Sequence, residues 1–236
     1  MSAAAKKPRR SGRPRPGRPK GDTGAAAVRR CFDRIAADPH WHAFTADERR
    51  RIDAFIRRWK IRPGDRVLEP GCGSGRLTAI LADLTGRSGT VLAFDASPVF
   101  MRLARRRGLP AQVTLRCGTV ASARFARDSF DHVVCFNVFP HLVPHLAAAR
   151  RLAAALKPGG VFWIAHTGSR RFVNDMHRGG PPAIRAHLLP APGPLARLLR
   201  EAGLSEVEIE DGAHHFLARA VRPPHAPASP NAHVRS

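Results

Sequence analysis

The sequence predicts a doubly wound α/β fold with a mostly parallel seven-stranded sheet, helices on both faces and a terminal antiparallel strand. Three observations support this prediction. Short apolar runs alternate with helical stretches from residue 66 onward, which is typical of β-α-β units. A glycine-rich turn at residues 71–75 follows the first of these runs and leads into a helix. The hydrophobic content of 43% is sufficient to form a core.

Two amphipathic helices are expected before the sheet, over residues 25–37 and 46–59. Thr45 and Glu48 form a capping-box pattern at the start of the second. The expected strands are short apolar runs, at residues 67–69, 90–95, 112–116, 132–137, 161–166, 206–210 and 214–220. The helices between them are expected at residues 75–84, 98–107, 144–156 and 194–202. An Asp-Gly turn at residue 211 separates the last two strands, so the last strand should be antiparallel.

The chain of 236 residues is expected to form one domain between two tails. Residues 1–23 form a basic tail, because residues 1–20 contain eight lysines and arginines and no acid. Residues 24–60 contain the helices expected to cover the ligand site. Residues 61–222 form the main domain, with a long insertion at 167–192 as a cap. Residues 223–236 lack apolar periodicity and form the second tail.

The composition limits the classes of function. The formal charge is +22, but 35 of the 40 basic residues are arginine, a skew that coding bias explains better than a nucleic-acid partner. No apolar run approaches the roughly 20 residues of a membrane span, and no export signal is visible. The four cysteines have no paired spacing, which argues against disulfides and zinc sites. We therefore expect a cytoplasmic protein without a membrane segment or a metal.

A glycine-rich loop between a strand and a helix is the strongest chemical signal. Gly71, Gly73 and Gly75 form a G-x-G-x-G pattern that permits positive φ and close approach of a ligand. Glu69 precedes the loop, and its carboxylate would repel a pyrophosphate but suits an ammonium or sulfonium group. Asp95 ends the next strand, where a carboxylate can accept bonds from both ribose hydroxyls. The two acids predict an adenosine with a cationic tail as the ligand.

Four motifs in chain order resemble those of the class I S-adenosylmethionine-dependent methyltransferases. They lie at residues 67–75, at 94–97 with Met101 following, at 129–134 and at 156–160. Within this class the sequence is similar to the ubiquinone/menaquinone C-methyltransferase-like group, also called methyltransferase type 11. The resemblance covers residues 61–221 and implies a Rossmann-like fold with S-adenosyl-L-methionine as cofactor.

The resemblance also implies a set of cofactor-binding residues. They are Glu69, Gly71, Cys72, Gly73, Gly75, Asp95, Ala96, Thr119, Val120 and Asn137. By this resemblance Glu69 and the glycine loop hold the methionine portion, and Asp95 holds the ribose. Ala96, Thr119 and Val120 flank the adenine, while Asn137 lies near the amino-acid end. Thr119 stands where the family often has an acid that accepts a bond from the adenine amino group, and a hydroxyl accepts such a bond more weakly.

Two histidines are candidate catalytic residues. His141 and His166 follow the ends of neighbouring strands, on the side of an open α/β sheet where ligands bind. An imidazole there can remove a proton as a methyl group arrives. Helix capping or surface exposure is the alternative for both residues. A metal pair is disfavoured, because no carboxylate or cysteine accompanies them at ligand spacing.

The insertion at 167–192 supplies candidate substrate contacts. Arg170, Asn174 and His177 would lie on one face of a helix, through spacings of four and three residues. They are expected to cap a polar or anionic substrate, and the alternative is a solvated surface helix.

We therefore expect methyl transfer to a small-molecule acceptor by in-line displacement, with proton removal by His141 or His166. One alternative is an RNA or protein methyltransferase recruited by the basic surface. Another is a non-catalytic DNA-associated protein that binds the cofactor, since Gly-Arg-Pro occurs at residues 12–14 and 17–19. Weak, non-specific attraction of polyanions to the tail fits the same residues. Fold and motifs leave the substrate, acceptor atom and oligomeric state open.

Overall fold

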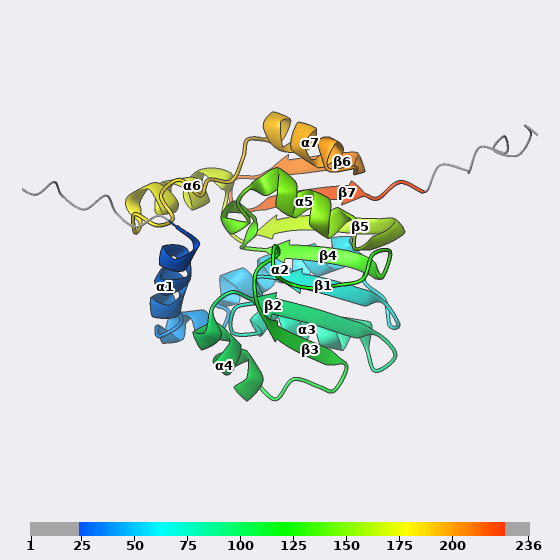
Figure 1. The fold of residues 1–236 in the computed structure, drawn as a ribbon, viewed down its shortest axis with the longest axis horizontal. Helices are drawn as coiled ribbons and strands as arrows, with labels where there is room; N and C mark the ends of the chain where they lie inside the picture. The colour runs from blue at the N-terminus through cyan, green and yellow to red at the C-terminus, as the bar shows by residue number, and fades with distance from the viewer. Residues whose placement is uncertain (1–23, 225–236) are drawn as a thin grey trace, which may run out of the picture.

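A computed structural model describes residues 24–224, so the tail predicted at 1–23 and all but the first two residues of the tail predicted at 223–236 lie outside this range. A seven-stranded sheet runs through the molecule in the order β3-β2-β1-β4-β5-β7-β6 (Figure 1). The strands are β1 Arg66–Pro70, β2 Thr90–Asp95, β3 Val113–Cys117, β4 Phe130–Phe136, β5 Leu156–His166, β6 Ser205–Asp211 and β7 Phe216–Val221. The helical elements are α1 Ala25–Ile35, η1 Pro39–His42, α2 Ala46–Trp59, α3 Arg76–Thr85, α4 Pro98–Arg106, η2 Phe139–His141, α5 His145–Ala153, α6 Arg170–Gly179 and α7 Pro192–Glu201.

The strand directions confirm the predicted doubly wound architecture. Strands β1 to β5 pair in parallel, and β7 pairs antiparallel with both β5 and β6. The turn before β7 is wider than the predicted Asp-Gly turn. Its closing bond runs from the Gly212 N–H to the His215 carbonyl, at 3.0 Å, so β7 begins at residue 216 and not at 214.

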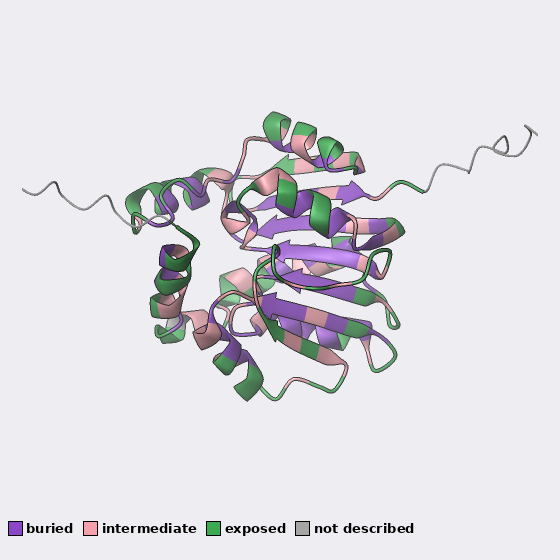
Figure 2. Cartoon of the chain, in the orientation of Figure 1, coloured by how far each residue is buried: buried purple, intermediate pink, exposed green. Residues whose placement is uncertain are grey.

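Helices cover both faces of the sheet and enclose two apolar cores (Figure 2). Helices α2 and α3 contribute Ile52, Trp59 and Leu81 to one core. Helices α5 and α7 contribute Leu152 and Leu199 to the other. Burying such a side chain stabilises a fold by about 1.5 to 3 kcal/mol, so these two layers fix the sheet on which the site is built.

The capping box predicted for the second N-terminal helix is present in the structure. Thr45 Oγ1 accepts a bond from the Glu48 N–H at 3.2 Å, and Glu48 Oε2 accepts one from the Thr45 N–H at 2.9 Å. The predicted capping box is therefore confirmed, and α2 begins and ends where the sequence predicts. Helix α1 ends at Ile35, two residues earlier than expected.

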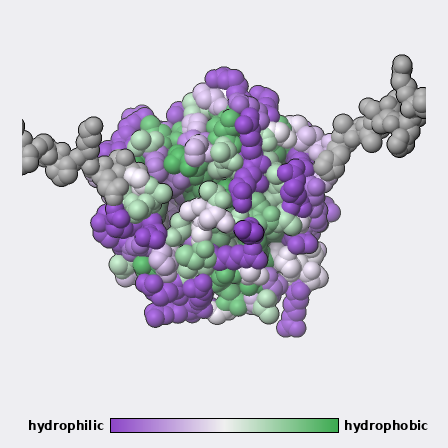
Figure 3. All heavy atoms as spheres, viewed as in Figure 1, coloured by the Kyte–Doolittle hydropathy of each residue, from purple (hydrophilic) through white to green (hydrophobic). Residues whose placement is uncertain are grey.

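The face shown in Figure 3 carries both polar and apolar side chains. Hydrophilic side chains surround the face shown in Figure 3, and hydrophobic ones gather nearer its middle. Among the large apolar side chains of residues 24–224, those exposed are Val143, Phe172 and Met176. None of the helices in this range has the length and apolar character needed to cross a membrane.

Candidate active site

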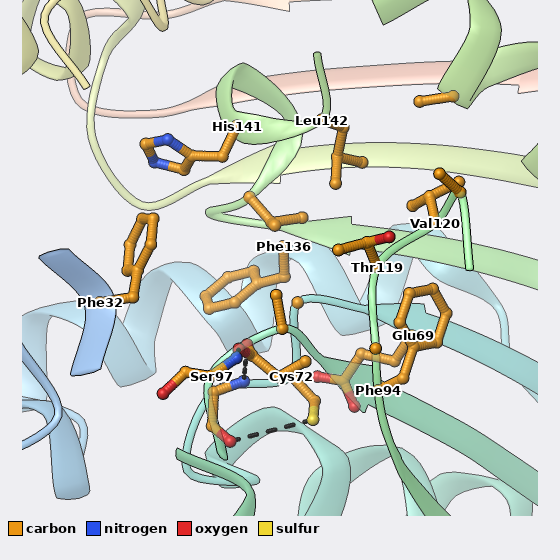
Figure 4. Close-up of a pocket in the computed structure, with 18 of the residues that line it drawn as sticks. Phe32, Glu69, Cys72, Phe94, Ser97, Thr119, Val120, Phe136, His141 and Leu142 are labelled. Atoms are coloured by element: carbon orange, nitrogen blue, oxygen red, sulfur yellow. Dashed lines mark hydrogen bonds between the residues drawn. The ribbon is translucent and has the colours of Figure 1, made fainter. Parts of the chain in front are cut away.

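A cavity of about 1130 Å³ lies at the carboxyl ends of β1, β2 and β4 (Figure 4). These ends meet where the strand order reverses between β1 and β4, the usual ligand site of an open α/β sheet. The cavity is slightly larger than the roughly 300 to 1,000 Å³ typical of small-molecule sites. It is therefore large enough for a cofactor and a second molecule beside it.

The glycine loop forms one wall of this cavity and depends on glycine at each position. The φ angles are +70° at Gly71, +55° at Gly73 and +77° at Gly75. A Cβ atom on Gly71 would lie 2.1 Å from Cγ2 of Val138, which follows β4. The Gly71 N–H also donates to the Phe94 carbonyl at 2.7 Å. Only glycine allows the loop to lie this close to the end of β4.

Asp95 holds the loop in this shape. Its Oδ2 accepts from the Gly73 N–H at 3.0 Å, and its Oδ1 accepts from the Ser97 N–H at 2.8 Å. Burial raises the pKa of Asp95, while these two hydrogen bonds act against the rise. A carboxylate oxygen has two acceptor positions, so each oxygen of Asp95 retains one for a ligand hydroxyl.

Glu69 lies deeper, at the end of β1, and is 2% exposed. Its Oε2 accepts a 2.6 Å bond from Thr78 Oγ1. Burial raises the pKa of Glu69 to about 8, Thr78 lowers it and Asp95 raises it further. Within residues 24–224, no basic side chain contributes to the pKa shift of either acid. Glu69 is buried and Asp95 is partly buried, and two acids without a cation beside them fit a positively charged ligand better than a pyrophosphate.

Most of the predicted cofactor residues come together around the cavity. Nine of the ten line it, namely Glu69, Gly71, Cys72, Gly73, Asp95, Ala96, Thr119, Val120 and Asn137. Gly75 is the exception, because it caps α3 and faces Ala104 of α4. The Asn137 side chain joins the ends of β4 and β5 through two bonds to Thr167, at 3.1 and 3.3 Å.

The two candidate bases lie in different surroundings. His141, in η2, lines the cavity, and its ring contacts Phe32 of α1 at 4.8 Å between centroids. Burial, followed by the charges of His177 and His187, lowers the pKa of His141 well below its ordinary value. His166 is buried at the end of β5 beside Phe216 and is absent from the cavity lining. Burial lowers the pKa of His166 to about 3.

The three predicted substrate contacts on α6 have other partners. Arg170 Nε donates to Oδ2 of Asp211 at 2.7 Å. Asn174 is buried and bonds both the N–H and the carbonyl of Leu189, at 2.7 and 3.1 Å. His177 Nδ1 bonds the His187 carbonyl. None of the three predicted residues lines the cavity, because Asn174 and His177 instead attach residues 187–189 to α6.

Sequence reasoning missed three residues of the site. Thr78, which bonds Glu69, lies in the first turn of α3, where its hydroxyl can reach back to β1. Ser97 Oγ donates a 2.6 Å bond to Asp33 and so ties α1 to the cavity rim. His187 reaches the cavity from the segment before α7, and no local pattern in the sequence indicates this.

Comparison with known proteins identifies the class that this fold and site define. Residues 67–160 match the family model described as a methyltransferase domain. The order of the strands, the glycine loop and its acids agree with that match. The chain contains a class I S-adenosylmethionine-dependent methyltransferase domain, and S-adenosyl-L-methionine is the cofactor of this class.

Two sequence relatives act in quinone metabolism according to their names. The chain is 33% identical over 147 residues to the ubiquinone biosynthesis O-methyltransferase of Xanthomonas campestris pv. campestris, covering 61% of this chain and 59% of that protein. It is 32% identical over 128 residues to the 2-phytyl-1,4-naphtoquinone methyltransferase of Synechococcus elongatus, covering 52% and 51%. The chain thus spans between half and three fifths of the length of these relatives.

Solved structures share the fold. An S-adenosylmethionine-dependent methyltransferase from Aquifex aeolicus has a TM-score of 0.62 at 18% identity, covering 82% of this chain and 98% of that one. A methyltransferase from Haloferax volcanii, solved in a complex with the Trm112 methyltransferase activator, has a TM-score of 0.65 at 22% identity, covering 81% and 97%.

Proposed function

We propose that the chain transfers a methyl group from S-adenosyl-L-methionine to a small aromatic acceptor related to quinones and their phenolic precursors. The observation that carries the proposal is one continuous cavity that contains the glycine loop with its two acids and also an apolar, aromatic wall bearing His141. When bound, the cofactor supplies an electrophilic methyl group.

The residues of the chain can bind the cofactor in a defined orientation. Asp95 offers carboxylate acceptors to ribose hydroxyls, and the loop around Gly73 that it fixes offers backbone to the methionine portion. Glu69 holds a proton in the unliganded fold, and an ammonium or sulfonium group bound beside it would favour its charged form, which then balances the charge of the ligand. The assignment of the adenine to Ala96, Thr119 and Val120 is consistent with their place in the cavity lining.

The chemistry of the opposite wall favours a flat, weakly polar acceptor. Phe32, Phe44 and Phe136 line the cavity, and the rings of Phe44 and Phe136 meet edge to face at 6.0 Å. Aromatic walls of this kind bind planar apolar molecules. The names of the two relatives point to the same class of acceptor.

The experiment has two stages. Calorimetric titration with S-adenosylmethionine and S-adenosylhomocysteine tests the cofactor site, and both should bind. The purified protein is then incubated with the methyl-labelled cofactor and either 4-tert-butylcatechol or 1,4-naphthohydroquinone as a probe acceptor. We expect S-adenosylhomocysteine and a labelled product from at least one probe. Cofactor binding without label transfer to either probe would overturn the proposed acceptor class, and absence of binding would overturn the whole proposal.

A further inference from the structure

Three histidines from separate segments meet at the acceptor side of the cavity. His141 belongs to η2, His177 to α6 and His187 to the segment between α6 and α7. The ring centroid of His141 lies 4.7 Å from that of His177 and 5.4 Å from that of His187. Within residues 24–224, no group of three ligating side chains is arranged so that it could hold a metal ion. The contacts between the imidazoles therefore require another explanation.

The contact between His141 and His187 is a hydrogen bond between like atoms. Their Nδ1 atoms are 3.2 Å apart. A neutral imidazole carries one N–H, so this bond requires one ring to be protonated at Nδ1 and the other to accept there. If His141 donates, its Nε2 has a free lone pair. No hydrogen bond to this Nε2 is found among the described residues, and the His141 side chain lines the cavity.

The position of His187 is fixed by residues that the sequence had suggested as substrate contacts. His177 Nδ1 donates to the His187 carbonyl, and Asn174 bonds both backbone groups of Leu189. Both side chains are buried. The backbone on either side of the His187 ring is therefore anchored to α6, which limits the directions in which the ring can turn.

Among residues 24–224, no acid contributes to the pKa shift of His141. The titratable groups whose charges act on it are all histidines, namely His145 of α5, His166 of β5, His177 of α6 and His187. Helix α1 presents Phe32, and its Asp33 is bonded to Ser97. A carboxylate commonly orients a catalytic histidine and stabilises its charged form. When His141 donates, the Nδ1 lone pair of His187 is the acceptor that occupies that position.

We propose that His187 is the positioning residue for His141 and receives its proton during methyl transfer to a hydroxyl oxygen of the acceptor, an inference that rests on the proposed function. As the new C–O bond forms, the bond between the methyl carbon and the sulfonium sulfur breaks and S-adenosylhomocysteine leaves with that electron pair, so the acceptor oxygen gains positive charge and its proton becomes strongly acidic. His141 Nε2 takes that proton. The proton on His141 Nδ1 passes to Nδ1 of His187, and His187 releases its Nε2 proton to water. No oxidation or reduction occurs, and one proton is lost to solvent. The two rings end in exchanged tautomers, and proton exchange with water restores them before the next turnover.

Substitution at His187 separates orientation from proton transfer. His187→Ala removes both functions, whereas His187→Asn keeps a hydrogen-bonding group near the position of Nδ1 but cannot carry a proton away. The matched control is His215→Asn, a histidine that bonds Glu210 outside the cavity lining. With 4-tert-butylcatechol as probe, we expect kcat to fall by about tenfold to hundredfold in His187→Ala and less in His187→Asn. The KM for the cofactor and the activity of the control should not change.

Imidazole nitrogen NMR of the wild type gives a readout that does not require turnover. We expect His141 to carry its proton on Nδ1 and His187 to carry its proton on Nε2, and the His141 signals to shift in His187→Ala but not in His215→Asn. Any other assignment of the two protons, or an unchanged kcat in His187→Ala, would overturn the relay. If the wild type binds the cofactor but methylates neither probe, the proposed function itself is wrong. This result needs no variant, so it is distinguished from failure of the relay.

Discussion

The two halves of the cavity are built in different ways. The cofactor half consists of the loop at residues 71–75 together with Glu69 and Asp95, and neighbouring backbone groups of β1, β2 and α4 hold it in place. The acceptor half consists of η2, α1 and the segment that carries His187, and contacts between residues 46 to 109 positions apart hold it. The first half depends on backbone conformation, and the second depends on how separate segments pack.

This difference predicts where each half tolerates change. The loop has three positive φ angles, and it lies so close to Val138 that there is no room for a Cβ atom. Substitution of its glycines would therefore change its shape. Segments that are held together by side-chain contacts can tolerate substitution of those side chains and still surround an acceptor. One cofactor can therefore be retained while the acceptor changes.

The largest effect is expected where the backbone of the cofactor half is tightest. Gly71→Ala places a Cβ 2.1 Å from Val138 at a φ of +70°. Strain and overpacking together should lower the free energy of unfolding by about 3 to 5 kcal/mol. Gly159→Ala is the control, because its φ is +79° but no atom lies within 4 Å of the new Cβ. It should cost only about 1 to 2 kcal/mol. Urea denaturation measures both, and equal losses would contradict the close approach.

Asp95→Ala should have the next largest effect, on cofactor binding. The change removes two backbone anchors, at Gly73 and Ser97, together with the acceptor for the ribose. We expect the affinity for S-adenosylhomocysteine to fall by about 1.5 to 3 kcal/mol, measured by calorimetry. Asp95→Asn retains the shape but loses the charge, so it should lie between the wild type and the alanine variant. An unchanged affinity in both variants would contradict the ribose assignment.

Glu69 gives the cofactor half a pH signature. Because its pKa is about 8 in the fold and 4.5 when exposed, the folded state holds a proton that the unfolded chain has lost. Stability should therefore fall as pH rises between these values, by up to about 1.4 kcal/mol per unit. Histidines with lowered pKa values, such as His141 and His166, act in the opposite direction below about 6.5. Between about pH 6.5 and pH 8, the change of stability with pH therefore reports on Glu69.

The measurement is urea denaturation across that interval. The wild type should lose about 2 kcal/mol more than Glu69→Gln, which retains the side-chain shape but does not titrate. Cofactor binding at neutral pH should also release a proton from the wild type, seen as a dependence of the binding enthalpy on buffer. Parallel stability curves for the two proteins would mean that Glu69 is already ionised in the fold.

The same contrast explains what could be predicted from the sequence. Residues 67–75 and Asp95 were predicted correctly as a unit, because short-range backbone rules determine a strand, a glycine turn and a helix. The helix containing Asn174 and His177 was also predicted, and they do share its buried face. The hydrogen-bond partners of Asn174 and His177 were not predicted. These partners belong to residues 187–189, and nothing in local spacing indicates which segment packs against a helix. His166 was expected to face the ligand crevice, but its side chain is buried in the core. The side chain at the end of a strand can pack against a neighbouring layer as well as face the crevice.

Asn174→Ala tests whether the two halves are independent, and its effect on the cofactor should be the smallest. The substitution leaves the buried N–H and carbonyl of Leu189 without partners, which should lower the free energy of unfolding by about 1 to 2 kcal/mol. It also loosens the segment that carries His187, so the KM for the acceptor should rise. The affinity for S-adenosylhomocysteine should change by less than about twofold, since Asn174 lies outside the cavity lining. A loss of cofactor affinity as large as that of Asp95→Ala would show that the halves are coupled, and α1, which contacts both Ser97 and His141, would then be the element that couples them.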